Sequence, residues 1–386
     1  MDRRRFLAQS AAAASVAGLA ACGPGPGNGR RNTGDSRETG PGIVTRPRLR
    51  WRLASSFPGA LDVIHGGAVT FADRLRQLTD GRFEVEVFEA GEIVPAFQVL
   101  DAVQSGSVEL GHSAGYYYLG KNPALVFDTV LPFGMSARQH DAWVREGGGG
   151  PLIDRALADF GVVGFPAGNT GAQMGGWFRQ PVGSLADLRG LRMRIPGLGA
   201  RVMERLGAIA QTIPGGEIYQ ALERGAIDAT EWVGPYDDSK LGFHEVVQTY
   251  HFPGWWEPSA TLSLYVNRAR WDALPSEYQA AIRLAAADAN ATMLHRYDAR
   301  NPAALADLLS GGVRLVPFPE DVMRAASRES SALMEETASA EGPAYREALE
   351  SYRSFQRASD RWLGSAELSL ARFAAEQART DAGRAA

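Results

Sequence analysis

Hydrophobic and polar residues follow two different periods along this chain, which predicts alternating strands and helices. From residue 48 onwards, short segments that alternate apolar and polar residues are separated by longer segments with apolar residues every three or four positions. The period-two segments predict strands at 49–54, 82–88, 108–112, 162–165, 191–195, 227–232 and 260–267. The helical spacing predicts helices at 63–78, 97–103 and 200–206. Repeated units of this kind favour parallel α/β sheets with right-handed crossovers.

The last part of the chain is dominated by helical patterns. From residue 276 onwards we expect a run of helices, interrupted at Pro302 and at Gly311 and Gly312, and residues 332–379 are almost wholly helical in composition. Two α/β regions followed by helices are typical of a hinged, two-lobed binding protein. We expect a first lobe at 48–166, completed by part of 232–268, a second at 167–231, completed by part of 258–330, and a C-terminal helical region at 331–386.

The N-terminal segment has the pattern of an export signal. Residues 3–7 (RRRFL) form a twin-arginine pattern, and residues 11–20 are small and apolar but too few to span a bilayer. Residues 19–22 (LAAC) resemble a bacterial lipoprotein box, so we expect removal of residues 1–21 and lipid on Cys22. Residues 22–47 are rich in Gly, Pro and Arg and predict a flexible tether. The sequence therefore predicts twin-arginine export to the periplasm and anchoring to a membrane.

Composition narrows the function classes. The chain has 386 residues, of which 45% are hydrophobic, enough for two packed lobes, and its formal charge of −4 gives no indication of a nucleic-acid partner. Cys22 is the only cysteine, so neither a disulfide within the chain nor a zinc site with cysteine ligands is available.

One segment resembles the nucleophile motif of an esterase. Residues 111–115 (GHSAG) match G-x-S-x-G after a predicted strand, and histidines and aspartates follow downstream of Ser113. A nucleophile elbow turns directly into a helix, whereas Ser113 is followed by a poor helix start at 116–123 (YYYLGKNP). An esterase is thus the distant alternative, and the sequence favours a protein that is not an enzyme.

Polar and aromatic residues gather in Gly-rich segments that follow the predicted strands. These segments are 168–173 (GNTGAQ), 191–195 (LRMRI), 230–235 (TEWVGP) and 252–258 (FPGWWEP). An arginine within a strand is more often an edge residue whose head reaches solvent, and tryptophan clusters are more often core. Taken singly, no segment separates a binding site from ordinary packing.

Taken together, these segments resemble a known family. The quoted segments, with WRLASSFPGALD, ALERGAIDATEW and FPGWWE, are similar to the substrate-binding subunit of tripartite ATP-independent periplasmic (TRAP) transporters. The similarity runs from about residue 50 to about residue 365, and TGAQMGGWF with FPGWW is typical of the branch that binds 2-oxo acids such as pyruvate. The resemblance implies a type II-like periplasmic-binding-protein fold with a hinged cleft and long C-terminal helices. It also implies a TRAP membrane permease as partner.

The resemblance implies a role for each matched position. Arg194 would grip a substrate carboxylate with both ends of its guanidinium, because a planar fork matches a planar carboxylate. On this view its charge is left for the guest anion and is not neutralised by a partner within the protein. Other substrate contacts are implied for Asn169, Tyr116, Tyr117, Glu231 and Trp256.

A cation is the second implied ligand. The resemblance assigns sodium, or alternatively calcium, to oxygen ligands from Gln173, Glu231 and the carbonyl of Trp232, with Glu257 as a further acceptor. Arg194 and sodium then balance Glu231 and the substrate carboxylate, which leaves a neutral buried cluster. The substrate is expected to be a small monocarboxylate such as pyruvate, with 2-hydroxy acids such as lactate or another organic acid as alternatives. The C-terminal helix implies a homodimer.

Overall fold

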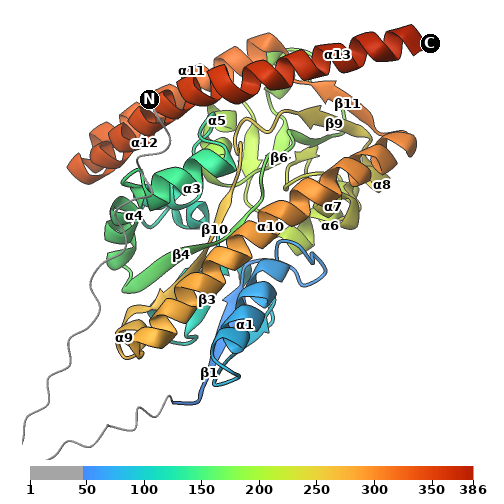
Figure 1. Ribbon diagram of the computed structural model, residues 1–386. Helices are drawn as coiled ribbons and strands as arrows, with labels where there is room; N and C mark the ends of the chain where they lie inside the picture. Colours follow the sequence, from blue (N-terminus) through green and yellow to red (C-terminus); the bar gives the residue numbers. More distant parts are fainter. Residues whose placement is uncertain (1–46, 386) are drawn as a thin grey trace, which may run out of the picture. The chain divides into compact units, whose positions relative to one another are not determined.

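The computed structural model describes residues 47–385, and its first sheet belongs to the first lobe (Figure 1). The strand order is β2-β1-β3-β10-β4, formed by β1 (Leu49–Ser55), β2 (Phe83–Phe88), β3 (Leu110–Ser113), β4 (Val162–Asn169) and β10 (Thr261–Asn267). β1 is parallel to β2 and β3, whereas β10 is antiparallel to both β3 and β4. The predicted parallel pairing is thus found for β1, β2 and β3, whereas β10 is antiparallel because it enters directly from the second lobe without a helical crossover.

The second sheet belongs to the second lobe and consists of shorter strands. Its order is β11-β9-β5-β8-β6-β7, formed by β5 (Gly176–Phe178), β6 (Arg192–Arg194), β7 (Ile209–Gln211), β8 (Ala229–Thr230), β9 (Thr249–Phe252) and β11 (Arg314–Pro317). The chain passes between the sheets from β4 to β5, from β9 to β10 and from β10 to β11. β11 lies in a segment for which only helices were predicted.

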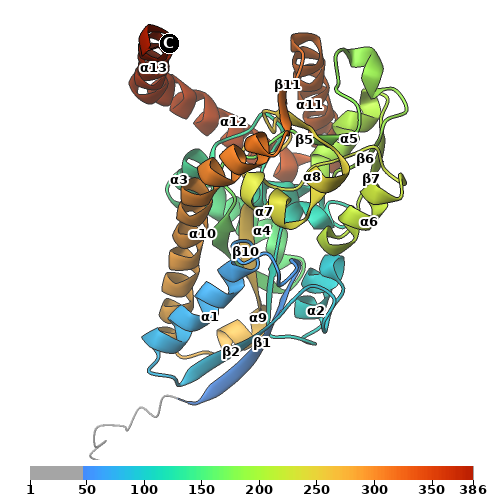
Figure 2. The same cartoon turned by 90° about the vertical axis from the view of Figure 1, so that its right-hand side faces the viewer.

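The long helix α10 (Ser276–Ser310) accompanies both lobes (Figures 1 and 2). It packs on α1 (Gly66–Leu78) and β4 of the first lobe and on α7 (Pro235–Lys240) of the second. The predicted break at Pro302 is wrong, because α10 continues through this residue. Proline removes one backbone donor from a helix, and here buried Tyr297 and Leu308 hold the chain on either side of it.

The C-terminal region is helical, as expected. α11 (Glu320–Glu341) ends at Gly342, where φ is 84° and the chain turns into α12 (Pro343–Leu363), followed by a π-helical segment (Gly364–Leu368) and α13 (Ser369–Ala385). α12 packs on α3 (Ala137–Arg145) and α4 (Gly149–Ala158). Within residues 47–385, no helix has the length and apolar character needed to cross a bilayer. The predicted signal segment, the predicted lipid site Cys22 and nearly all of the tether lie outside the described residues.

Candidate functional site

A small cavity lies between the two lobes. Its apolar and aromatic wall comes from segments attached to the first sheet: Phe57, Ile64, Tyr116, Tyr117, Ala260 and Leu262. Its polar lining comes from Thr170 and Gln173, which follow β4, from Arg194 at the end of β6, and from Trp232 after β8. The free volume is about 10 Å³, room for about one water molecule. Binding of any larger molecule therefore requires the lining to move apart.

Arg194 is fully buried at this cavity, with 1% of its surface exposed. Its Nε donates to the carbonyl of Ile213 (3.0 Å), and its Nη1 donates to the carbonyl of Glu231 (3.0 Å) and forms an ion pair with the Glu231 carboxylate. The guanidinium also lies 5.2 Å from the ring centre of Trp232. Among the described residues, Nη2 has no hydrogen-bond partner. One guanidinium nitrogen of this cavity-lining residue is thus left without a protein acceptor.

The expectation that the Arg194 charge is free for a guest anion is only partly met. Glu231 already pairs with Nη1, because a buried arginine without a counter-charge would be strongly destabilising. A two-ended grip on a carboxylate needs a second free nitrogen, and here only Nη2 is without a partner. The arrangement therefore offers one guanidinium nitrogen to an anion unless Glu231 turns away.

Two buried carboxylates share the single cationic side chain. Glu231 is 1% exposed, and burial raises its pKa well above the ordinary value in spite of Arg194. Glu257 is 4% exposed, and its Oε2 accepts hydrogen bonds from Gln173 Nε2 (3.0 Å) and Tyr116 Oη (3.4 Å). Burial raises the pKa of Glu257 to about 7. With both carboxylates ionised the cluster lacks one positive charge, which a bound cation would supply.

Gln173 presents an acceptor that no protein donor satisfies. Its Nε2 donates to Thr170 Oγ1 (3.0 Å) and to Glu257 Oε2, so the orientation of the amide is fixed by its neighbours. Its Oε1 is buried and has no partner among residues 47–385. The carbonyl oxygen of Trp232 likewise receives no backbone hydrogen bond within the described part of the chain. Amide, carbonyl and carboxylate oxygens are the ligands that hard cations prefer, so this donor set fits sodium or calcium.

Asn169 and Trp256 lie next to the site but are not part of the cavity lining. The Asn169 amide donates to Thr261 Oγ1 (3.1 Å) and accepts from Gly171 N–H (2.8 Å). Trp256 packs against Trp255 and Phe318, with ring centres 4.9 and 5.7 Å apart. The lining residues that sequence reasoning missed are Thr170, Phe57, Ile64, Val233, Ala260 and Leu262.

The esterase motif is not assembled as a nucleophilic site. Ser113 is fully buried, and its Oγ bonds to Ser56 Oγ (2.6 Å) and Tyr118 Oη (2.8 Å). Neither ring nitrogen of the adjacent His112 has a partner within residues 47–385, and burial lowers its pKa to about 3. No histidine of the described chain bonds to Ser113, so the base that would activate it is missing.

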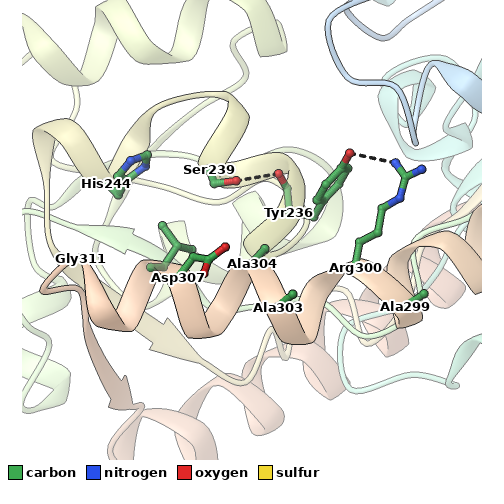
Figure 3. Close-up of a pocket in the computed structure, with 10 residues that line it drawn as sticks. Tyr236, Ser239, His244, Ala299, Arg300, Ala303, Ala304, Asp307 and Gly311 are labelled. Atoms are coloured by element: carbon green, nitrogen blue, oxygen red, sulfur yellow. Dashed lines mark hydrogen bonds between the residues drawn. The ribbon is translucent and has the colours of Figure 1, made fainter.

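A second hollow lies on the surface between α7 and α10, with a volume of about 510 Å³ (Figure 3). Tyr236 and Arg300 stand at one end of it, and Arg300 Nη1 donates to Tyr236 Oη (2.8 Å; Figure 3). Both side chains also bond to Asp62 of the first lobe, as does Lys240. Partial burial acts to raise the pKa of Asp62, but its hydrogen bonds with Lys240 and Arg300 outweigh burial and lower it to about 2. This ion cluster connects the two lobes outside the cavity.

Comparison with known proteins agrees with this geometry. Residues 54–341 match the DctP family, described as bacterial extracellular solute-binding protein, family 7. A monocarboxylate 2-oxoacid-binding periplasmic protein of Nostoc is 48% identical over 374 residues, which cover 97% of this chain and 99% of that protein.

Solved structures give the same family. A TRAP transporter solute-binding protein of Bordetella bronchiseptica, a mixed-occupancy dimer with copurified calcium and picolinate, is 45% identical, with a TM-score of 0.85 over 87% of this chain and 100% of that one. A TRAP protein of Pseudoalteromonas atlantica with bound sodium and pyruvate is 36% identical, with a TM-score of 0.81 over 84% of this chain and 99% of that one. The predicted two-lobed fold and the predicted family are confirmed: this chain belongs to the DctP family of periplasmic solute-binding proteins, the solute receptors of TRAP transporters.

Proposed function

We propose that this receptor binds a small 2-oxo monocarboxylate together with a cation and presents it to a TRAP membrane permease. The observation that carries the proposal is the pairing, at one cavity, of a free guanidinium nitrogen on Arg194 with an unsatisfied oxygen on Gln173. One attracts an anion and the other a cation. A 2-oxo acid suits both, because its carboxylate and its neighbouring carbonyl oxygen can share one metal ion.

The two ligands have separate partners in this proposal. Arg194 Nη2 contacts the substrate carboxylate, and Tyr116 and Tyr117 enclose the acid. Gln173 Oε1, the Trp232 carbonyl, Glu231 and Glu257 surround the cation. Asn169 and Trp256 act indirectly: Asn169 fixes the turn that carries Thr170 and Gln173, and Trp256 supports the segment that carries Glu257.

The formal charges are compatible with either expected cation. With sodium, neutrality is reached when Glu257 is protonated, because Arg194 and sodium then balance Glu231 and the acid. With calcium, neutrality is reached when Glu257 is ionised. A pKa of about 7 for Glu257 allows both states near neutral pH. Relatives with bound calcium or sodium beside pyruvate support this flexibility.

Titration calorimetry with the purified receptor tests the proposal. We expect pyruvate to bind in buffer that contains sodium or calcium, and binding to be lost in chelated buffer that lacks both ions. Lactate is the competing ligand, since it keeps the carboxylate but replaces the 2-oxo group with a hydroxyl. Succinate is expected to bind poorly, because Arg194 is the only basic residue of the cavity lining. Pyruvate binding that is unchanged without cations would remove Gln173 and Glu257 from the site.

We also propose the anchoring and assembly that the sequence predicts. Lipid on Cys22 would hold the receptor at a membrane after twin-arginine export, and metabolic labelling with a radioactive fatty acid tests it through Cys22→Ala. A homodimer through the C-terminal helices is supported by the exposed apolar side chains Trp362, Leu370 and Phe373. Sedimentation of Phe373→Asp beside the parent protein tests that assembly.

A further inference from the structure

A third buried carboxylate, Asp238, lies behind the proposed cation site. It is 1% exposed and belongs to α7, just after the loop that leaves β8. Its Oδ2 accepts from Trp177 Nε1 (2.9 Å) and Tyr250 Oη (2.6 Å), and its Oδ1 accepts from the backbone N–H groups of Val233 (3.2 Å) and Gly234 (3.1 Å). Asp238 does not line the cavity.

The bond to Val233 determines the direction of the Trp232 carbonyl. The N–H of Val233 and the C=O of Trp232 belong to one peptide plane, and in a trans peptide these groups point in opposite directions. Since the N–H points at Asp238, the C=O points away from it. Both Trp232 and Val233 line the cavity. Asp238 therefore orients a carbonyl oxygen that the proposed function assigns to the cation.

The same loop is connected to Gln173. Met174 N–H donates to the carbonyl of Val233 (3.0 Å), and Gly254 N–H donates to the carbonyl of Gln173 (3.1 Å). Gly176 allows this segment to lie close to β8, because its φ is 86° and a Cβ there would lie 2.4 Å from the Thr230 carbonyl oxygen. Movement of the loop after β8 thus also displaces the segment that carries the unsatisfied Gln173 oxygen.

Asp238 has an electrostatic effect as well. Burial raises its pKa to about 6 although four donors oppose this, so it is ionised at neutral pH. It lies close enough to Glu231 for the two carboxylates to repel each other when both are ionised. The second lobe therefore holds a buried carboxylate near Glu231 in addition to the proposed cation ligands, and a bound cation reduces the repulsion between the two.

We infer that Asp238 is a positioning residue for the cation, which orients the Trp232 carbonyl and the Gln173 segment and strengthens cation binding without touching either ligand. This inference rests on the proposed function. It predicts an effect on cation affinity that is separable from the contact between Arg194 and the substrate.

The test compares Asp238→Asn with a matched control. Asp128→Asn also removes a buried carboxylate, one whose oxygens accept from Ser263 Oγ (2.7 Å) and Tyr265 Oη (2.7 Å) in the first lobe, and whose pKa burial raises to about 6. Calcium and sodium chlorides are titrated into each protein without acid, and pyruvate is then titrated at saturating cation. We expect Asp238→Asn to weaken cation binding about tenfold or more, with pyruvate binding at saturating cation changed less than about threefold. Asp128→Asn should leave both unchanged.

Equal losses of cation affinity in the two variants, or a change in melting temperature alone, would overturn the inference. If Asp238→Asn does not fold, Trp177→Phe and Tyr250→Phe each remove one donor to Oδ2 and leave the charge in place. We expect them to weaken cation binding about threefold, and an unchanged affinity in both would also overturn it. A parent protein that binds neither cation nor pyruvate would instead contradict the proposed function.

Discussion

The two sides of the cavity differ in chemistry. The first lobe contributes an apolar and aromatic wall from Phe57, Ile64, Tyr116, Tyr117, Ala260 and Leu262, whereas the second contributes Arg194, Glu231 and the Trp232 carbonyl. The strands behind them differ too: those of the first sheet have four to eight residues and those of the second only two to four.

The difference in chemistry follows from the groups that the segments around each sheet present. In the first lobe, five of the six wall residues lie in loops or short helical turns beside the sheet, and they present rings and alkyl groups to the cavity. Short strands end early and leave carbonyl and amide groups in loops, where they are available to a ligand or to a buried carboxylate. We therefore expect the first lobe to select the size of the acid and the second to select its charge.

The largest expected effect is the loss of the second lobe's cationic group. Arg194→Ala should weaken pyruvate binding by about 2–5 kcal/mol, or roughly 30-fold to several thousand-fold, because it removes one partner of a buried charge pair. Calorimetry measures it, with a melting curve to verify folding. Arg192→Ala is the matched control: Arg192 lies two residues earlier on β6 but pairs with Asp228 outside the cavity (2.6 Å). Equal losses in both variants would contradict the assignment.

The next effect is a pH dependence of binding. The pKa of Glu257 is about 7, so the carboxylate is mostly ionised at pH 8 and mostly protonated at pH 6. Calcium requires the ionised form for a neutral cluster, so calcium affinity should fall as the pH falls, by roughly tenfold per unit below pH 7. Glu257→Gln should have weak affinity with this dependence removed. A parent affinity that is constant between pH 6 and pH 8 would exclude Glu257 as a ligand.

A smaller effect is expected at the first lobe's wall. Ala260→Val adds two methyl groups to the lining and should weaken binding of longer-chain 2-oxo acids about tenfold relative to pyruvate. This is the discrimination expected when an apolar pocket is too small for one additional methylene group of the ligand. Competition calorimetry with a series of chain lengths measures the ratio. A uniform loss for all acids would mean that the wall does not select size.

The smallest effect concerns the contact between the lobes. Asp62→Asn weakens the ion cluster with Lys240 and Arg300, and because half-exposed pairs contribute only about 0–1 kcal/mol, we expect at most about a fivefold loss of affinity that shrinks in high salt. Glu86→Gln is the control, since its pair with Arg50 (3.1 Å) lies within the first sheet. A loss that salt does not alter would contradict an electrostatic link.

The sequence predicts the first lobe better than the second. The segments of β1, β2 and β10 alternate over six or seven residues, which is enough to predict them. By contrast, β5, β7, β9 and β11 contain only three or four residues, too few to establish a period. The continuation of α10 through Pro302 depends on tertiary contacts on both sides, which a local pattern does not contain.

The site could be predicted only in part, and the missing parts again depend on tertiary contacts that a local pattern does not contain. Family resemblance placed Arg194, Gln173 and Glu231 together, and the structure brings them to one cavity or to its edge. The resemblance placed Asn169 in the site, whereas in the structure its neighbour Thr170 lines the cavity. Adjacent residues at the end of a strand face opposite ways, so an error of one residue changes which side chain is predicted to reach the site. The ion pair between Arg194 and Glu231 depends on distances across β6 and β8, which sequence spacing does not reveal.

The sealed position of Arg194, Glu231 and Gln173 determines how a guest would be exchanged. With at most 6% of each residue exposed, a competitor in solution does not reach these groups while the lobes stay together. Release then waits for the lobes to separate, so an excess of unlabelled acid should not hasten the departure of a labelled one. The residence time of the acid is then set by the rate at which the lobes open. A docked permease could increase that rate without competing for the substrate.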